Sequence, residues 1–440
     1  MDELRLRIVK SALHDTASRQ TDQTAECHSG TRWLLLQQLV ESPVFLQRLI
    51  QWLRGPAGAG KTSVMRRVAK RLEERGEFLG GFYFWRSDSA CNNLNAFIST
   101  LAVQLAKYDP TTLPFIEEAM REDKNLLDKP LKTQMEKLII APILAVHHDN
   151  PSASHPHAFV FDGLDECNVD AQREFLEDLL PTLASCLSHL RITIFVSSRP
   201  EADIDNQFKH PRLSDYTNGI CLEPSKQDIR KYLDGEFAEI IRRCPGLKNE
   251  NGERWPRRGD VGFLEDKSYG CFIFVKTAMQ YIKPDKLRGR APDERLRDVL
   301  QVLRAEPLRA LDALYLLILR ENAPKDPAEF EEWKTCIGLA CIPLKDFSEW
   351  AEVFGDDAFR LLYGRHRSDV DQMMKDLGPL FYMDDKTGQP RNYHTSLPDC
   401  LFNAERSAEF AMNPNHLHER ITCAIVGTLN TFRPLAPPGT

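Results

Sequence analysis

A glycine-rich segment near the N-terminus has the residue types and spacing of a phosphate-binding loop. Residues 55–62 read GPAGAGKT and satisfy G-x-x-x-x-G-K-[ST] at every fixed position. Glycines let such a loop turn with positive φ and bring its N–H groups onto phosphates. Lys61 is expected to reach the β- and γ-phosphates, and the Thr62 hydroxyl to ligate Mg²⁺. ATP or ADP binding is therefore predicted for Gly55, Pro56, Ala57, Gly58, Ala59, Gly60, Lys61, Thr62 and Ser63.

A second segment ends in a group of carboxylates. The apolar run Ala158–Phe161 leads into Asp162, and Asp165 and Glu166 follow. A carboxylate at the C-terminal end of a buried strand faces the crevice where nucleotides bind in open α/β sheets. Asp162 is therefore predicted to hold Mg²⁺ through water. Asp165 and Glu166 are candidates to orient or activate the attacking water, or are acids that complement the dipole of a following helix.

An arginine closes a third apolar run. Residues 192–196 read ITIFV, and SSRP follows at 197–200. An arginine at the end of a strand can contact the γ-phosphate and report its presence. On spacing alone, a solvated loop arginine is an equal interpretation of Arg199.

The elements that position these motifs alternate between two periodicities. Short apolar runs predict strands at 49–53, 80–85, 158–161 and 192–196. Helical periodicity is found at 31–39, 62–72, 94–108 and about 170–180. This alternation predicts an α/β fold, a P-loop NTPase parallel sheet with helices on both faces. Beyond about residue 220 the chain is expected to be helical, with segments near 229–241, 272–282, 296–303 and 311–319.

Composition narrows the class of protein further. The 440 residues carry a net charge of only -7, and with no global basic field a nucleic-acid partner is not expected. Eleven cysteines without a CxxC pair indicate reduced thiols and a cytoplasmic location. Cys27-His28 supplies too few ligands for zinc. No apolar run approaches the ~18 residues of a spanning helix, so no membrane partner is expected.

Together the three motifs resemble the NACHT family within the STAND class of signalling NTPases. The glycine after Asp162 and the acidic pair that follows separate that family from most kinases and transporters. Further similarities point to fungal NACHT proteins and to nephrocystin-3-like N-terminal NTPases. They are CHSGTR at 27–32, GCFIFV at 270–275, LDALY at 311–315, HTSLPDCL at 394–401 and RSAEF at 406–410. The resemblance covers roughly residues 27–420.

The resemblance implies a nucleotide-dependent switch. In that family ADP holds a compact off state, and exchange for ATP opens it and permits oligomerisation. Thr31 and Arg32 are then expected near the base or ribose, and His394 at the ADP β-phosphate, although a structural histidine is an equal interpretation of His394. The implied domains are an N-terminal segment (1–30), a NACHT NTPase domain (31–220), a helical domain (221–320), a winged-helix-like domain (321–430) and a tail (431–440).

This sequence departs from the family pattern at several positions. Leu397, Pro398 and Cys400 stand where aromatic and polar residues are usual, and Lys276 replaces a small residue. Without a repeat sensor or a long N-terminal effector, the chain is expected to be a minimal core that works with partners, or a chain that lacks its ends.

The function that these observations favour is an ATP/ADP switch with slow, weak ATPase activity. Its expected partners are nucleotide, Mg²⁺, and copies of itself or other signalling proteins. A role in fungal innate-immunity-like or programmed cell death signalling rests on family analogy alone. The alternatives are an ordinary P-loop ATPase or kinase and a truncated nucleotide-binding scaffold. We find no set of lid arginines typical of kinases, and the intact motif residues argue against a degenerate scaffold.

Overall fold

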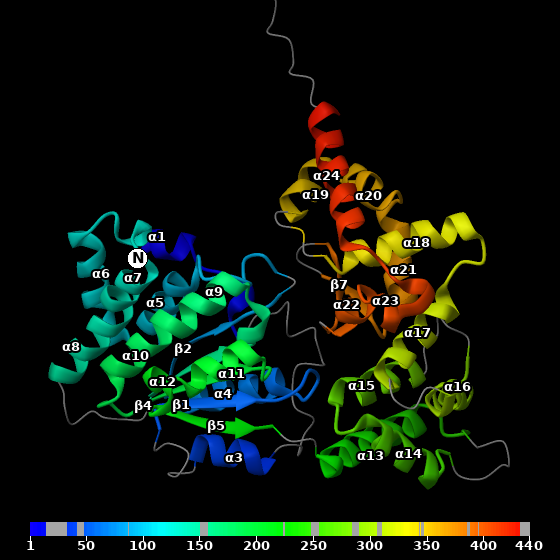
Figure 1. Cartoon of the computed structure of the whole chain (residues 1–440), viewed down its shortest axis with the longest axis horizontal. Helices are drawn as coiled ribbons and strands as arrows, with labels where there is room; N and C mark the ends of the chain where they lie inside the picture. The colour runs from blue at the N-terminus through cyan, green and yellow to red at the C-terminus, as the bar shows by residue number, and fades with distance from the viewer. Residues whose placement is uncertain are drawn as a thin grey trace, which may run out of the picture. The chain divides into compact units, whose positions relative to one another are not determined.

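The chain folds into two compact units, an N-terminal unit, Met1–Asp228, and a C-terminal unit, Ile229–Thr440 (Figure 1). The computed structural model describes residues 1–14, 33–41, 48–86, 88–149, 157–222, 225–247, 255–283, 290–305, 310–342, 344, 347–384, 388–394 and 396–431. Within these ranges, no helix is both long and apolar enough to cross a membrane.

The N-terminal unit is built on a five-stranded sheet of order β2-β3-β4-β1-β5. Its strands are β1 (Ile50–Arg54), β2 (Phe78–Tyr83), β3 (His157–Asp162), β4 (Ile192–Ser198) and β5 (Thr217–Cys221). All neighbouring pairs are parallel, as predicted. The strand predicted at 80–85 in fact begins at Phe78 and ends at Tyr83. Beyond Tyr83, the Phe84 N–H still donates to the carbonyl of Asp162, the last residue of β3, at 2.9 Å.

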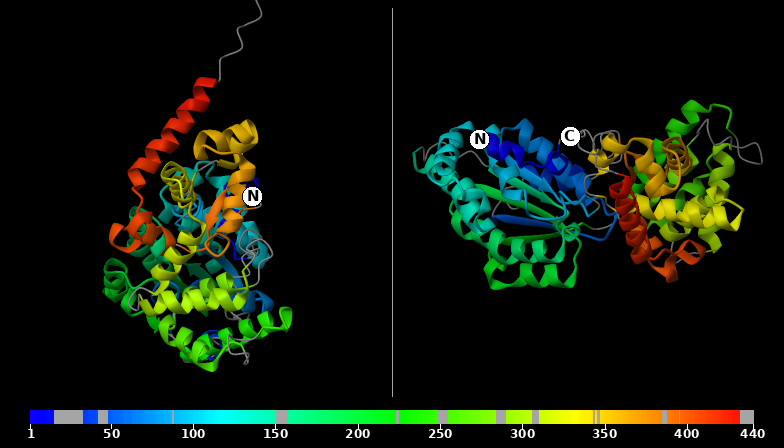
Figure 2. Two further views of the ribbon diagram at one scale, coloured as in Figure 1. Left: turned by 90° about the vertical axis from the view of Figure 1, so that its right-hand side faces the viewer. Right: turned by 90° about the horizontal axis from the view of Figure 1, so that it is seen from above.

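Helices cover both faces of this sheet, as the α/β prediction required (Figure 2). The helices of the N-terminal unit are α1 (Asp2–Leu6), α3 (Trp33–Glu41), α4 (Lys61–Glu74), α5 (Phe97–Tyr108), α6 (Leu113–Glu122), α7 (Leu131–Met135), α8 (Ala141–Asp149), α9 (Val169–Glu174), α10 (Leu180–Leu187), α11 (Ala202–Lys209) and α12 (Pro211–Ser214). The helix predicted at about 170–180 is α9 and α10 joined by a π-helical segment, η7 (Phe175–Leu179).

Alternate side chains of β3 enter two different cores, because successive residues of a strand point to opposite faces. Ala158 and Val160 pack with α3 and α4. Phe159 and Phe161 enter the larger core, which also contains apolar side chains of α5, α10 and α11. Burial on both faces explains why this strand is a continuous apolar run rather than an alternating one.

The outer edge of β2 is closed by a side chain. Gln104, which is buried on α5, accepts from the Gly81 N–H at 3.1 Å and donates to the Gly81 carbonyl at 2.8 Å. A Cβ on Gly81 would lie 2.7 Å from the Val160 carbonyl oxygen, so only glycine fits there. The amide of Gln104 thus takes the place that a neighbouring strand would occupy.

The first fourteen residues belong to the N-terminal unit. Leu4 and Ala12 are fully buried in its larger core. Arg7 donates to the Leu127 carbonyl at 3.2 Å, and the Val9 N–H donates to the Thr100 hydroxyl at 3.2 Å. These contacts hold the start of the chain along α5.

The C-terminal unit is mainly helical. Its helices are α13 (Lys226–Arg243), α14 (Arg258–Ser268), α15 (Phe272–Ile282), α16 (Pro292–Ala305), α17 (Ala310–Asn322), α18 (Pro327–Ala340), α19 (Phe347–Phe354), α20 (Asp356–Tyr363), α21 (Arg367–Asp376), α22 (Ser396–Leu401), α23 (Ala404–Ser407) and α24 (Pro414–Thr431). An antiparallel pair, β6 (Phe381–Met383) and β7 (Pro390–Asn392), lies between α21 and α22 in the chain. The four helices predicted from periodicity correspond to α13, α15, α16 and α17.

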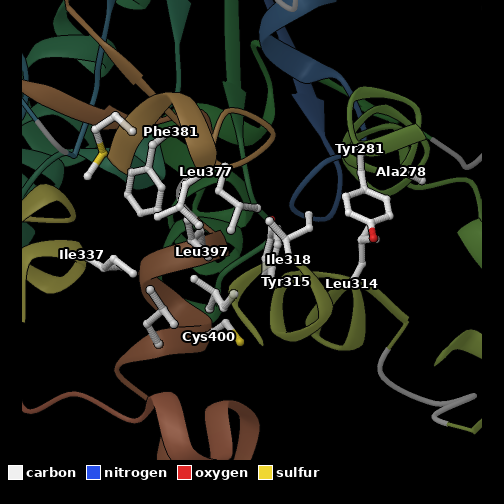
Figure 3. Close-up of a cluster of buried hydrophobic side chains, with 14 of the residues drawn as sticks. Ala278, Tyr281, Leu314, Tyr315, Ile318, Ile337, Leu377, Phe381, Leu397 and Cys400 are labelled. Carbon is white, nitrogen blue, oxygen red and sulfur yellow. The ribbon is translucent and has the colours of Figure 1, made fainter. Parts of the chain in front are cut away.

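One continuous hydrophobic core runs through the C-terminal unit, from Ile229 to Ala424. Part of this core joins Tyr281 and Leu314 to Leu377, Phe381 and neighbouring side chains (Figure 3). The division of this half into a helical domain and a winged-helix-like domain stays a prediction.

Candidate functional site

The predicted phosphate-binding loop connects β1 to α4. Gly58 and Gly60 have φ of +73° and +89°, a region that L side chains rarely adopt. Nothing lies within 4 Å of a Cβ built on Gly60, so the backbone angle and not space requires glycine there. Gly60 is the N-cap of α4, whose N-terminus carries partial positive charge. The loop therefore has the backbone that binding an anion requires.

Lys61, Thr62 and Ser63 form the first turn of α4. The Lys61 ammonium donates to the Gly55 carbonyl at 2.8 Å and to the Pro56 carbonyl at 3.0 Å. Burial lowers the pKa of Lys61 below its ordinary value, while the nearby carboxylates of Asp165 and Asp162 act in the opposite direction. The Thr62 side chain is exposed to solvent. The cation is thus held against the loop, beside acidic groups.

Asp162 ends β3 and is only 2% exposed. The buried Ser197 hydroxyl on β4 donates to Asp162 Oδ1, and the Gly163 N–H donates to Ser197 Oγ at 3.0 Å. The parallel pairing of β3 and β4 brings the two side chains together. Sequence reasoning missed the part played by Ser197, although its place at the end of a neighbouring strand was a usable signal.

The structure joins Asp165 to Arg199. Asp165 Oδ2 lies 3.0 Å from Arg199 Nε, and Asp165 Oδ1 accepts from the Arg199 N–H at 2.9 Å. The two side chains are 3% and 20% exposed, respectively. Both oxygens of the carboxylate are engaged, so the pair fixes the direction of the guanidinium.

Glu166 is half-buried and has a different partner. Its Oε2 accepts from the Arg86 N–H at 3.3 Å, and the Arg86 guanidinium donates to the Asp165 carbonyl at 3.1 Å. Arg86 follows β2 and was not predicted as a site residue. The pKa of Glu201 is raised, first by burial and then by the charge of Asp165. Four carboxylates and three cations therefore gather near the C-terminal ends of the strands.

Asp165 and Glu166 lie before the N-terminus of α9, whose dipole was the alternative explanation for these two acids. Asp165 and Glu166 lie in a 3-10 turn, η6 (Leu164–Glu166), and α9 begins three residues later. The N-cap of α9 is Asn168, whose Oδ1 accepts from the Ala171 N–H at 2.8 Å. Asn168, and not Asp165 or Glu166, therefore caps the first turn of α9.

The donor set at this site suits Mg²⁺ with a nucleotide. Thr62 and Asp162 offer hard oxygen ligands, and Mg²⁺ commonly completes its shell with water and phosphate oxygens. Within the described residues, no group of three or more His, Cys, Asp and Glu could hold a metal by itself. A metal here would depend on phosphate oxygens beside Thr62 and Asp162.

Three other predicted site residues lie elsewhere in the chain. Thr31 and Arg32 fall outside the described residues. His394 follows β7 in the C-terminal unit and is half-buried. Its carbonyl accepts from Asn392 Nδ2 at 2.9 Å, and its Nδ1 accepts from the Ser396 N–H at 3.1 Å.

Comparisons with known proteins agree with the motif analysis at the level of a family model. A model described as "Nephrocystin 3, N-terminal" matches residues 30–199. No curated protein sequence matches the chain. Among solved structures, Cdc6p from Pyrobaculum aerophilum aligns at 14% identity with a TM-score of 0.33, covering 93% of this chain and 98% of that chain. Drosophila ORC bound to poly(dA/dT) DNA and Cdc6 aligns at 12% identity with a TM-score of 0.33, covering 95% of this chain and 72% of that chain.

The sheet order, the loop between β1 and α4, and the matched family model together identify a P-loop NTPase fold of the α/β class. Its features are those of a nucleotide-binding site.

Proposed function

We propose that this chain is an ATP/ADP-binding NTPase of the NACHT type that uses its nucleotide as a conformational switch and hydrolyses ATP slowly. One observation carries the proposal. The phosphate-binding loop, Asp162 and the pair of Asp165 with Arg199 all lie at the C-terminal ends of β1, β3 and β4. That edge is where open α/β sheets bind their ligands.

Asp165 and Glu166, the two acids that follow Asp162, have different proposed roles. Asp165 is nearly inaccessible and its oxygens are bound to Arg199, so it positions that arginine rather than activating water. Glu166 is more exposed and takes the role of general base. A base must reach the proton that it abstracts, directly or through one water. Arg199, held by Asp165, senses the γ-phosphate.

Thr62 and Asp162 would hold Mg²⁺, which would offset the phosphate charge of a bound nucleotide. Lys61 binds the phosphates, and Ser197 fixes the orientation of the Asp162 carboxylate. Thr31 and Arg32 are assigned to the base or ribose by the family resemblance alone. The role of Ser197 rests on its hydrogen bond to Asp162, and the other assignments extend the motif resemblance to residues of this chain.

The switch requires the two nucleotides to prefer different conformations. A difference in affinity of about 10²–10³-fold, or about 3–4 kcal/mol, moves most of a two-state population. We also propose that ATP-bound copies of the chain associate with one another in the cytoplasm, without a membrane or nucleic-acid partner. The family resemblance alone extends this proposal to immune-like or cell-death signalling in a fungus.

The first test is the nucleotide content of the purified chain, read by chromatography after denaturation. We expect stoichiometric ADP. A chain that is empty, binds ATP loosely and turns it over rapidly would contradict the switch and favour an ordinary ATPase.

Single-turnover hydrolysis of ATP tests the different roles proposed for Asp165 and Glu166. Glu166→Gln is expected to keep ATP binding and slow hydrolysis by about 10²-fold or more, the usual contribution of a general base. Asp170→Asn, an exposed acid in the first turn of α9, is the matched control and should change nothing. Unchanged hydrolysis in Glu166→Gln would remove that residue from the chemistry.

A further inference from the structure

The chain between β2 and α5 contacts both acids that follow Asp162. The part of it that matters here, residues 84–86 and 88–92, is named the post-β2 segment. Its Arg86 N–H donates to Glu166 Oε2 at 3.3 Å, and the Arg86 guanidinium donates to the Asp165 carbonyl at 3.1 Å. Arg86 therefore contacts both the Glu166 carboxylate and the backbone of the turn that carries it, and so restrains where that carboxylate lies.

Backbone hydrogen bonds hold both ends of the post-β2 segment to the same stretch of chain. At its start the Phe84 N–H donates to the Asp162 carbonyl at 2.9 Å, and at its end the Asn92 carbonyl accepts from the Asn168 N–H at 2.7 Å. Gly163 lies between these contacts, and a Cβ built on it would be 3.1 Å from the Phe84 carbonyl oxygen. The two stretches are therefore closely packed, and a shift of one is expected to move the other.

Asp88 organises the middle of the post-β2 segment. Its Oδ1 accepts from the Ala90 N–H at 3.0 Å, and its carbonyl accepts from the N–H groups of Cys91 and Asn92, both at 2.9 Å. Its own N–H donates to the Trp85 carbonyl at 3.0 Å. Because these bonds reach both halves of the segment, a contact with the Asp88 side chain acts on the whole of it.

The start of the chain supplies such a contact. The Ser11 hydroxyl donates to Asp88 Oδ2 at 2.7 Å, because a carboxylate can only accept, and Ser11 Oγ lies 3.1 Å from Cys91 Sγ. Ser11 belongs to η1 (Lys10–Ala12) and is half-buried, and both Ala12 and Cys91 are fully buried. A hydrogen bond to a charged acceptor in a partly shielded place is stronger than one between neutral groups. Residues 1–14 are thus linked through Asp88 to the segment that holds Glu166.

We propose that Ser11, Asp88 and Arg86 are positioning residues that keep the Glu166 carboxylate in place for hydrolysis, so that docking of residues 1–14 controls the hydrolysis rate. This inference rests on the proposed role of Glu166 as general base. With Ser11 bonded to Asp88, the post-β2 segment holds the turn that carries Glu166. When residues 1–14 leave their place along α5, the segment loosens, hydrolysis slows and the ATP-bound state lasts longer.

Binding of the nucleotide is expected to be largely independent of this device. The phosphate-binding loop follows β1, and the sheet order places β3 and β4 between β1 and β2. His14 is a second contact of the same N-terminal stretch, with its Nε2 2.9 Å from Glu73 Oε2 near the C-terminal end of α4. Removing residues 1–14 would therefore disturb two places at once, whereas a substitution at Ser11 disturbs only the contact with Asp88.

The kinetic test measures single-turnover hydrolysis and ATP affinity in the full chain. Ser11→Ala should slow hydrolysis about threefold to tenfold, the effect of one net hydrogen bond, and leave ATP affinity unchanged. Ser11→Asp places a second negative charge beside Asp88 and should slow hydrolysis further. Ser185→Ala is the matched control, because it removes an exposed hydroxyl of α10 that bonds only within that helix and should change neither quantity. In a Glu166→Gln background Ser11→Ala should add nothing, because its effect passes through Glu166.

Hydrogen exchange of the same variants shows where the change occurs. In Ser11→Ala, peptides that cover 84–92 and 163–168 should exchange faster, and those that cover α4 should not. If Glu166→Gln slows hydrolysis while Ser11→Ala and Ser11→Asp match the wild type, the inference is wrong and the proposed function stands. A loss of ATP affinity in Ser11→Ala, or an equal slowing with and without Glu166, would indicate a general structural role and would also overturn the inference. If Glu166→Gln leaves hydrolysis unchanged, the proposed general base itself is wrong.

Discussion

The pair formed by Asp165 and Arg199 makes a quantitative prediction about the stability of the nucleotide-binding edge. Removing one partner of a buried ion pair costs about 3–5 kcal/mol. The Arg199 side chain is one-fifth exposed, so we discount the pair to about 2 kcal/mol. The bond from the Arg199 N–H to a charged acceptor adds about 1.5 kcal/mol. Asp165→Ala should therefore lower the free energy of local unfolding by about 3–4 kcal/mol.

A graded series separates these two contributions. In Asp165→Asn the amide oxygen can still accept from the Arg199 N–H, so only the ion pair is lost, at about 2 kcal/mol. Arg199→Ala retains its own N–H and should cost about the same. The double variant with Asp165→Ala should fall short of the sum by about 2 kcal/mol, which is the coupling within the pair.

Hydrogen exchange measured by mass spectrometry on peptides that cover β3 and β4 provides the free energies. Local measurement is needed because a chain with two units need not unfold in a single transition. Additive effects of the two alanine substitutions, or a loss below about 1 kcal/mol in Asp165→Ala, would refute the assignment of a shielded, coupled pair.

Three further perturbations have expected outcomes. Lys61→Ala should leave the purified chain without ADP, as measured by chromatography. In the wild type, the affinity for ADP should fall as the pH rises, and the fall should begin below the ordinary lysine pKa. Burial lowers the pKa of Lys61, and the neutral amine no longer attracts phosphate. Gln104→Leu should lower the free energy of local unfolding by about 2–4 kcal/mol, measured by hydrogen exchange in β2, because it leaves the buried N–H and carbonyl of Gly81 without a partner. Asp312→Ala removes the ion pair with Arg406 of α23 and should speed amide hydrogen exchange in that helix. The expected loss of stability is about 1–2 kcal/mol, because the partial exposure of Arg406 weakens the pair.

The sequence predicted the parts of the fold whose signals are local. The loop at 55–62 and the strands β3 and β4 were recognisable because their spacing and apolar runs lie within a few consecutive residues. β5 was missed because only Ile220 is buried in it, and its other residues are held by pairing with β1, which is remote in the chain.

The candidate site shows the same limit. Asp162, Asp165 and Glu166 carry a recognisable spacing, but their partners come from remote segments: Ser197 lies on β4 and Arg86 follows β2. Such contacts join residues that are 35 and 80 positions apart, so no local pattern records them. Only the sheet order brings these side chains to one edge.

The closed edge of β2 limits how copies of this chain can join. An edge strand with unpaired backbone groups is a template for strand addition, which leads to fibrils and domain exchange. Gln104 occupies the outward N–H and carbonyl of Gly81, so an incoming strand would first have to displace a buried amide. Assembly of ATP-bound copies, if it follows the proposed switch, therefore has to proceed through side-chain surfaces and not by extending the sheet at β2. Gln104→Leu would remove this protection, and slow aggregation of that variant should accompany its loss of stability.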